Sequence, residues 1–324
     1  MGTFFCPHHN PQRNTKGIST MQIKKAAIIG MGALGLLYGN HIADHIGPEA
    51  VDFLLGAERY DKYLKKTFEI QGEEQKLPIA RAEEAKPYDL VILAVKYGAI
   101  HSAFETMKYA IGPNTILLSV MNGITSEDMM GERFGRENLI YTVAQGMDAM
   151  HFGDTLRYTK MGELRIGIVE DGKKENLDAV VDFLNRAKIP CVVEENIRKR
   201  MWGKFMLNVG INQTCMAYEC TYSQALTPGE ANDVLMGAME EVIQISQAEG
   251  IGLTHADLDY YVAILKTLDP DGVPSMRQDG MAGRKTEVDM FAGTVIKIAE
   301  KHGMDAPVNR FIYKKVKEME SELC

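Results

Sequence analysis

Residues 24–35 read KKAAIIGMGALG, an apolar run that ends in a G-x-G-x-x-G pattern at Gly30, Gly32 and Gly35. The next residues, LLYGNHIADHI, have the apolar spacing of a helix. A strand that passes through a glycine turn into a helix is the setting in which this pattern binds the pyrophosphate of a dinucleotide. A turn without a ligand is the alternative. We predict cofactor binding by the six residues of the turn: Gly30, Met31, Gly32, Ala33, Leu34 and Gly35.

The segment after this helix bears on the choice of dinucleotide. VDFLL (51–55) is predicted to be the second strand, and an NAD site usually has Asp or Glu at the end of this strand. Here the strand ends at Gly56, and Asp52 stands too early. Arg59 follows in the loop, where a guanidinium group can bind the 2′-phosphate of NADP. The sequence therefore favours NADP, with a solvated loop arginine as the alternative.

Two further predicted strands end in polar side chains. YDLVILAVK (88–96) ends in Lys96, and NTILLSVMNG (114–123) ends in Asn122 and Gly123. The carboxyl ends of parallel strands face the ligand crevice of a doubly wound sheet. We therefore predict that Lys96 and Asn122 contact cofactor or substrate, although a lysine at a strand end is commonly only a polar terminus.

The chain divides into two halves of different class. Strands and helices alternate over residues 21–194, with a hairpin-like pair at 155–169, a helix at 174–187 and a strand at 189–194. From residue 195 the pattern is helical, with helices predicted at 198–219, 229–250, 254–268, 280–302 and 307–322. We predict a Rossmann-type doubly wound α/β domain (21–194) followed by an all-α domain (195–324). Residues 1–20 are polar and without periodicity, and are predicted to be a disordered extension.

One helix of the second half carries a polar stripe. In MWGKFMLNVGIN (201–212), Lys204, Asn208 and Asn212 fall at positions i, i+4 and i+8, which share one face of a helix. The other residues are apolar or glycine, so this helix is predicted to be buried on nearly all sides. A buried lysine must be desolvated or face a polar cavity. We predict an active-site wall here, and a solvated stripe on a half-exposed helix is the alternative.

A third cluster of polar residues lies in VPSMRQDGMAGRKTEVD (273–289). Ser275 follows a proline and precedes a predicted helix, and Glu287 is expected deep within that helix. From this segment alone, Glu287 is interpreted as part of a solvated helix face that also carries Arg284 and Lys285.

Together these residues resemble the ketopantoate reductase (2-dehydropantoate 2-reductase) family. The resemblance lies in the glycine turn, Lys96, Asn122-Gly123, the W-x-K-x-x-x-N-x-x-x-N run at 202–212, the S-M-x-Q-D-x-x-x-x-R-x-T-E-x-D run at 275–289 and the G-x-x-x-I-G run at 162–167. It covers residues 21–322 in the right order. Where members of the family commonly have arginine at the end of the second strand, this chain has Gly56, so the cofactor preference is the weakest part of the resemblance.

The resemblance implies an NADPH-dependent reduction of 2-dehydropantoate to pantoate, in pantothenate and coenzyme A biosynthesis. Lys204 is implied to protonate the ketone oxygen, and Glu287 to fix the substrate hydroxyl and assist the lysine's charge, which reverses the interpretation from the segment alone. The implied substrate-binding residues are Asn122, Asn208, Asn212 and Ser275. The implied cofactor contacts outside the glycine turn are Arg59, Lys96, Asn122 and Glu287.

Three other functions remain open at this point. The first is a related 2-keto acid reductase, because the family that this chain resembles also contains look-alikes with unassigned 2-keto acid substrates. A β-hydroxyacid dehydrogenase also combines a glycine turn with a K-x-x-x-N helix, but Asn212 and the run from Ser275 to Glu287 favour the reductase. A catalytically silent NADP-binding regulator is expected to lose Lys204 or Glu287, and this chain keeps both.

Composition indicates a soluble cytoplasmic enzyme with a small-molecule substrate. The chain has 324 residues, 45% of them hydrophobic, and no apolar run long enough to cross a membrane. Its net charge of −8 argues against a nucleic-acid partner. The five cysteines lack metal-ligand spacing, so no metal is expected, and Cys215 and Cys220 are interpreted as buried thiols rather than a redox pair. A homodimer is consistent with the apolar C-terminal helices.

Overall fold

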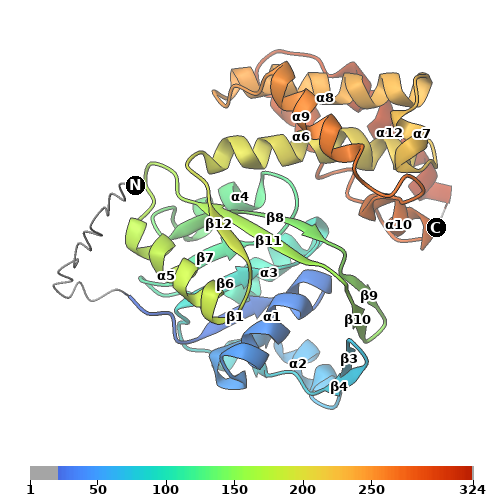
Figure 1. Cartoon of the computed structure of the whole chain (residues 1–324). Coiled ribbons are helices and arrows are strands. Elements are labelled where there is room, and N and C mark those ends of the chain that lie inside the picture. The colour runs from blue at the N-terminus through green and yellow to red at the C-terminus, as the bar shows by residue number, and fades with distance from the viewer. Residues whose placement is uncertain (1–20, 323–324) are drawn as a thin grey trace, which may run out of the picture.

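The computed structural model describes residues 21–322, and the extension predicted over residues 1–20 lies outside this range. The chain forms a sheet half and a helical half, with one long helix, α6 (Ile197–Ala217), lying between them (Figure 1). The predicted Rossmann-type α/β fold with an all-helical C-terminal region is confirmed.

An eight-stranded sheet is the centre of the N-terminal half. Its strand order is β12-β11-β8-β7-β6-β1-β2-β5, and every neighbouring pair is parallel except β8 with β11. The inner strands are apolar and buried on both faces, as expected where helices cover a parallel sheet. The strands are β1 (Ala26–Ile29), β2 (Val51–Leu55), β5 (Ile79–Arg81), β6 (Leu90–Leu93), β7 (Ile116–Ser119), β8 (Leu139–Met147), β11 (Met161–Gly167) and β12 (Cys191–Val193).

The connections between the strands are mostly helical. The α-helices of this half are α1 (Ala33–His45), α2 (Ala57–Tyr63), α3 (Ile100–Met107), α4 (Ser126–Phe134) and α5 (Lys174–Arg186). Three short 3₁₀ turns also occur: η1 (Pro48–Ala50), η2 (Ala82–Glu84) and η3 (Tyr97–Ala99). The turns η2 and η3 follow β5 and β6 at the edge of the sheet where the glycine turn lies, so these loops are placed beside the predicted cofactor site.

A second, four-stranded sheet, with order β4-β3-β10-β9, lies beyond the end of the main sheet (Figure 1). It consists of β3 (Phe68–Ile70), β4 (Glu73–Gln75), β9 (Met150–Phe152) and β10 (Thr155–Arg157). The hairpin predicted at 155–169 is wrong, because β10 pairs with β9 and β3 whereas β11 pairs with β8 and β12. The carboxylate of Asp148 accepts the backbone N–H groups of Thr159 (2.8 Å) and Lys160 (2.7 Å), and this turns the chain back onto β8.

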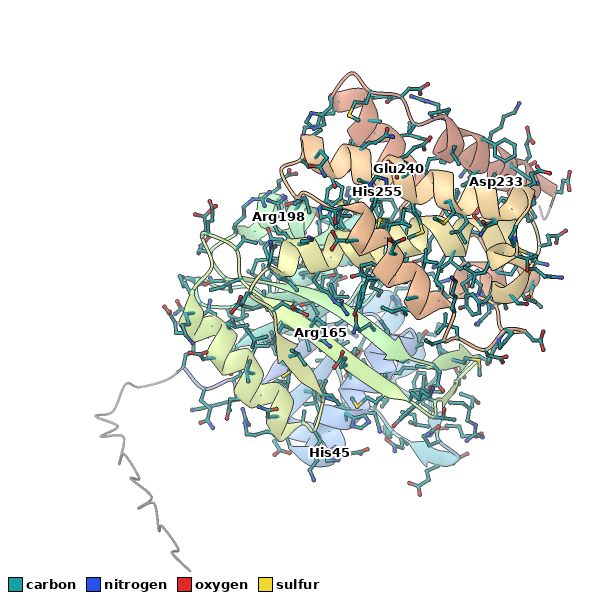
Figure 2. The ribbon with its side chains drawn as sticks, turned by 45° about the horizontal axis from the view of Figure 1, so that its top comes forward. His45, Arg165, Arg198, Asp233, Glu240 and His255 are labelled. Carbon is teal, nitrogen blue, oxygen red and sulfur yellow. The ribbon has the colours of Figure 1, made fainter. Side chains whose placement is uncertain are left out.

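The C-terminal half consists of helices packed around α6. The others are α7 (Tyr222–Leu226), α8 (Glu230–Ala248), α9 (His255–Leu265), α10 (Ser275–Met281), α11 (Ala292–Lys301) and α12 (Pro307–Glu322). The single helix predicted over 280–302 is wrong: α10 ends at Met281, Gly283 has a φ of +63°, and α11 begins at Ala292. On the outer surface, His255 of α9 lies against Glu240 of α8, with 2.9 Å between Nε2 and Oε2 (Figure 2).

The two halves meet where α6 packs against β8 and β11. The sheet half ends with β12 at Val193 and α6 begins at Ile197, next to the predicted boundary. Within residues 21–322, no helix is both long and apolar enough to span a bilayer.

Candidate active site

The glycine turn after β1 has the geometry of a phosphate cradle. Gly30 has a φ of +115°, and a Cβ there would overlap the carbonyl oxygen of Ala94. A Cβ on Gly35 would overlap the carbonyl oxygen of Gly30, so α1 packs directly on the turn. Gly32 is different, because a Cβ there would meet no atom within 4 Å. The first turn of α1 has no side-chain cap and no acidic residue, which leaves its N–H groups available to a phosphate.

The predicted 2′-phosphate contact, Arg59, lies on the exposed side of α2. Its guanidinium carbon is 5.5 Å from the ring centroid of Tyr63, one turn further along the helix. The side chain therefore points along α2 towards Tyr63. Gly56, at the other end of this helix, precedes its first residue, Ala57.

Lys204 is supplied by the helical half and held by the sheet half. Its Nζ donates to the side-chain oxygen of Asn122 (2.8 Å), in the loop after β7, and to the backbone carbonyl of Ala144 on β8. The pKa of Lys204 is lowered from 10.5 to about 8, with burial as the main cause. The nearby Arg200 contributes to this lowering, whereas Glu287 and Glu127 oppose it. An ammonium group with this pKa is a usable proton donor near neutral pH.

Arg200 extends the polar stripe of α6 by one turn towards the N-terminus of the helix. Its guanidinium donates to the side-chain oxygen of Gln145 (2.7 Å) and to the hydroxyl of Tyr261 (3.4 Å). Arg200 and Lys204 thus attach α6 to consecutive residues of β8, Gln145 and Ala144. Arg200 is not among the residues predicted from the sequence, although its position four residues before Lys204 continues the same spacing.

Glu287 lies in the turn that leads into α11 and not deep within a helix, so that expectation is wrong. Its backbone carbonyl accepts the N–H groups of Met290 and Phe291, both at 3.0 Å, which fixes the turn. Burial raises the pKa of the Glu287 carboxyl group. Lys96, Asn122 and Lys204 oppose this rise, so Glu287 lies near cations and amides from both halves.

Lys96 forms a second link between the two halves, from the sheet half to α10. Its Nζ lies 2.6 Å from Oδ2 of Asp279 on α10, and Arg284 donates to the second oxygen of the same carboxylate at 2.8 Å. Asp279 is buried, whereas its two cationic partners are largely exposed. Ser275, the first residue of α10, is exposed one turn before Asp279. Asp279 was also missed, although its spacing of four residues from Ser275 places both on one helix face.

Asn208 and Asn212 complete the stripe on α6. Both are buried, with 6% of their surface exposed. Neither side chain makes a hydrogen bond to another residue in the part of the chain that the structure describes. Each side-chain amide carries both donors and an acceptor, so these two residues can bind a polar ligand.

The structure therefore combines a glycine turn on the sheet half with a buried lysine of the helical half that contacts the sheet. A sheet half with a dinucleotide turn, joined to a helical half that presents a buried lysine, is the architecture of a nicotinamide-dependent oxidoreductase.

The chain belongs to the ketopantoate reductase (PanE/ApbA) family. The family model matches residues 26–171, and the model of the family's C-terminal part matches residues 196–320. A 2-dehydropantoate 2-reductase of Streptococcus pyogenes serotype M3 is 27% identical over 305 residues, which are 91% of this chain and 98% of the relative. One from Pyrococcus abyssi is 29% identical over 312 residues, 92% of this chain and 98% of the relative.

Solved structures have the same fold. A D-mandelate dehydrogenase in a ternary structure with NADH and anilino(oxo)acetate aligns with a TM-score of 0.82 at 22% identity, covering 92% of this chain and 99% of that one. The dimeric ketopantoate reductase of Staphylococcus aureus aligns with a TM-score of 0.76 at 20% identity, covering 93% and 100%.

Proposed function

We propose that this protein reduces 2-dehydropantoate to pantoate with a reduced nicotinamide dinucleotide. The observation that carries the proposal is Lys204, a buried lysine with a pKa lowered to about 8 that Asn122 holds at the junction of the two halves. The family membership supplies the substrate, because the curated relatives are named 2-dehydropantoate 2-reductases. The sequence predicts NADPH as the hydride donor, from Arg59 and the family resemblance.

The proton donor is Lys204. A reduced nicotinamide, when bound, supplies the hydride for the ketone carbon. The ketone oxygen gains negative charge as the carbon is attacked, and an ammonium group beside it stabilises that charge and transfers a proton. Burial makes this proton easier to release, and Glu287 keeps the lysine from losing it too early, because a nearby carboxylate favours the charged form.

The remaining predicted residues orient the substrate and the cofactor. Asn208 and Asn212 are assigned to the substrate carboxylate and hydroxyl groups, because their amides lie on the same face of α6 as Lys204. Ser275 is assigned to the same ligand from the start of α10. Lys96 is assigned to cofactor and substrate contacts, and in the present structure Asp279 holds it at 2.6 Å.

The test is an assay of purified protein with 2-dehydropantoate and either NADPH or NADH, followed by the loss of nicotinamide absorbance. Substrate-dependent oxidation with formation of pantoate is expected. A 3-hydroxy acid with the oxidised cofactor tests for a β-hydroxyacid dehydrogenase, and an aromatic 2-keto acid tests for a related reductase. Binding of a dinucleotide without turnover of any of these substrates would refute the proposal and favour the silent regulator.

The proposed enzyme acts as a homodimer, like the Staphylococcus aureus reductase whose structure is described as dimeric. Light scattering of the purified protein in solution measures its mass directly. A mass of about 36.1 kDa, that of one chain, would refute the dimer.

A further inference from the structure

The residue expected to bind the adenosine ribose is missing from its usual place. In a Rossmann-type site an acidic residue at the end of the second strand accepts hydrogen bonds from the ribose hydroxyls of NAD. In this chain β2 ends at Leu55, and the next residue is Gly56, which has no side chain. The space beside Gly56 is therefore available to a side chain from another segment.

Glu83 occupies this space. β5 lies parallel to β2 with Leu55 opposite Arg81, so the chain that leaves β5 runs beside the chain that leaves β2. Glu83 follows two residues later, in η2. Its Oε1 accepts the backbone N–H of Ala57 at 3.2 Å, and it lies 3.7 Å from the position that a Cβ of Gly56 would take.

The neighbouring cations are directed elsewhere. Arg81 lies 2.6 Å from the carboxylate of Asp61 and 3.8 Å from that of Glu84. Arg59 points along α2 to the ring of Tyr63, away from the end of β2. The charge nearest Gly56 is therefore the carboxylate of Glu83. A carboxylate in this place is able to accept hydrogen bonds from a ribose diol and would repel a 2′-phosphate.

We propose that Glu83 replaces the missing acidic residue of β2, binds the adenosine ribose hydroxyls, and makes NADH the preferred cofactor over NADPH. This inference rests on the proposed dinucleotide site, and it reverses the preference predicted from Arg59. The family resemblance does not decide the matter, because the arginine that members commonly have at the end of this strand is absent here.

The experiment measures dissociation constants of NADH and NADPH by calorimetry, without substrate, for the native protein, Glu83→Gln and Glu84→Gln. The native protein is expected to bind NADH about tenfold or more tightly than NADPH. Glu83→Gln removes a charged acceptor and a repelling charge, so NADH binding should weaken about tenfold and NADPH binding should strengthen. Glu84 is the matched control, since it is the exposed neighbour that contacts Arg81, and Glu84→Gln should leave the ratio unchanged.

Three results would overturn the inference. The first is tighter binding of NADPH than of NADH by the native protein, and the second is the same ratio of NADH to NADPH dissociation constants in Glu83→Gln and Glu84→Gln. The third is a loss of NADPH binding in Arg59→Ala with no effect of Glu83→Gln. Failure to bind either dinucleotide would refute the cofactor site itself. Binding without reduction of 2-dehydropantoate would refute only the proposed substrate, because the ratio of the two constants still tests Glu83.

Discussion

Replacing Arg200 with glutamine should move the alkaline limit of activity to higher pH. Arg200 lies one turn before Lys204 on α6, and its charge is one cause of the lowered pKa of that lysine. Lys204 donates a proton only while protonated, so activity is present below its pKa and falls as the pH rises through about 8. Removing a positive neighbour favours the charged lysine and raises this pKa.

Coulomb's law gives the order of magnitude of the shift for two charges on neighbouring turns of a helix. Two unit charges about 8 Å apart repel by about 2 kcal/mol at an effective dielectric constant of 20, which corresponds to about 1.5 pH units. Glu194 lies 3.9 Å from Nε of Arg200 and offsets part of this repulsion. We therefore expect the limit to rise by about one pH unit. The carboxylate of Glu194 keeps a partner in the variant, because Arg165 lies 3.1 Å from it.

The assay is the pH dependence of kcat/KM from about pH 6 to pH 10 at saturating cofactor. Arg200→Lys is the matched control, because it keeps the charge and should keep the native limit. Glu287→Gln should act in the opposite direction, since Glu287 raises the pKa of Lys204. An unchanged limit in Arg200→Gln, or equal shifts in the glutamine and lysine variants, would refute this account of the lysine.

Three further predictions concern the other parts of the site. Lys204→Ala should lower kcat by about 10²–10⁴ with little change in the dissociation constant of the cofactor, and normal turnover would refute its role. Gly32→Val should keep the native melting temperature, because its Cβ position is free of protein atoms, and should weaken cofactor binding more than about tenfold. Gly35→Ala should instead lower the free energy of unfolding by about 1–3 kcal/mol, because its Cβ would overlap the glycine turn. Equal melting temperatures in the two variants would contradict this difference. Asp279→Asn should lower the melting temperature by a few degrees, because it leaves two cations without their shared partner; a native melting curve would show that the bridge to Lys96 contributes nothing.

The sequence predicted best those parts of the fold that local spacing determines. The strand at 51–55 and the helices α6, α8, α9 and α12 lie within a few residues of their expected bounds, because each has a continuous apolar pattern or a clear end. The prediction of a hairpin at 155–169 is wrong because β10 and β11 pair with other strands and not with each other. Asp148 accepts the backbone N–H of Thr159 in the turn that separates β10 from β11. A local pattern carries no information about such partners.

The candidate site was predicted residue by residue but not as an arrangement. Spacing on α6 indicated that Lys204, Asn208 and Asn212 share a face, and the structure buries both amides there. The charged residues before Glu287 are compatible with a helix, so the sequence predicts a helical position for it. In the structure α10 ends at Met281, and Gly283 follows in a left-handed conformation. The partners Asp279 and Ala144 come from the packing of the two halves, which no pattern within a single segment describes.

The position of Lys204 at the junction also makes its acidity depend on both halves of the molecule. The helix carries the ammonium group, and the sheet half supplies the Asn122 and Ala144 oxygens that accept its hydrogen bonds. If the halves separate, water reaches the ammonium group and its proton affinity returns towards that of an ordinary lysine. The acidity of Lys204 therefore depends on the contact between the two halves, and its pKa of about 8 is a measure of how closely they pack around it.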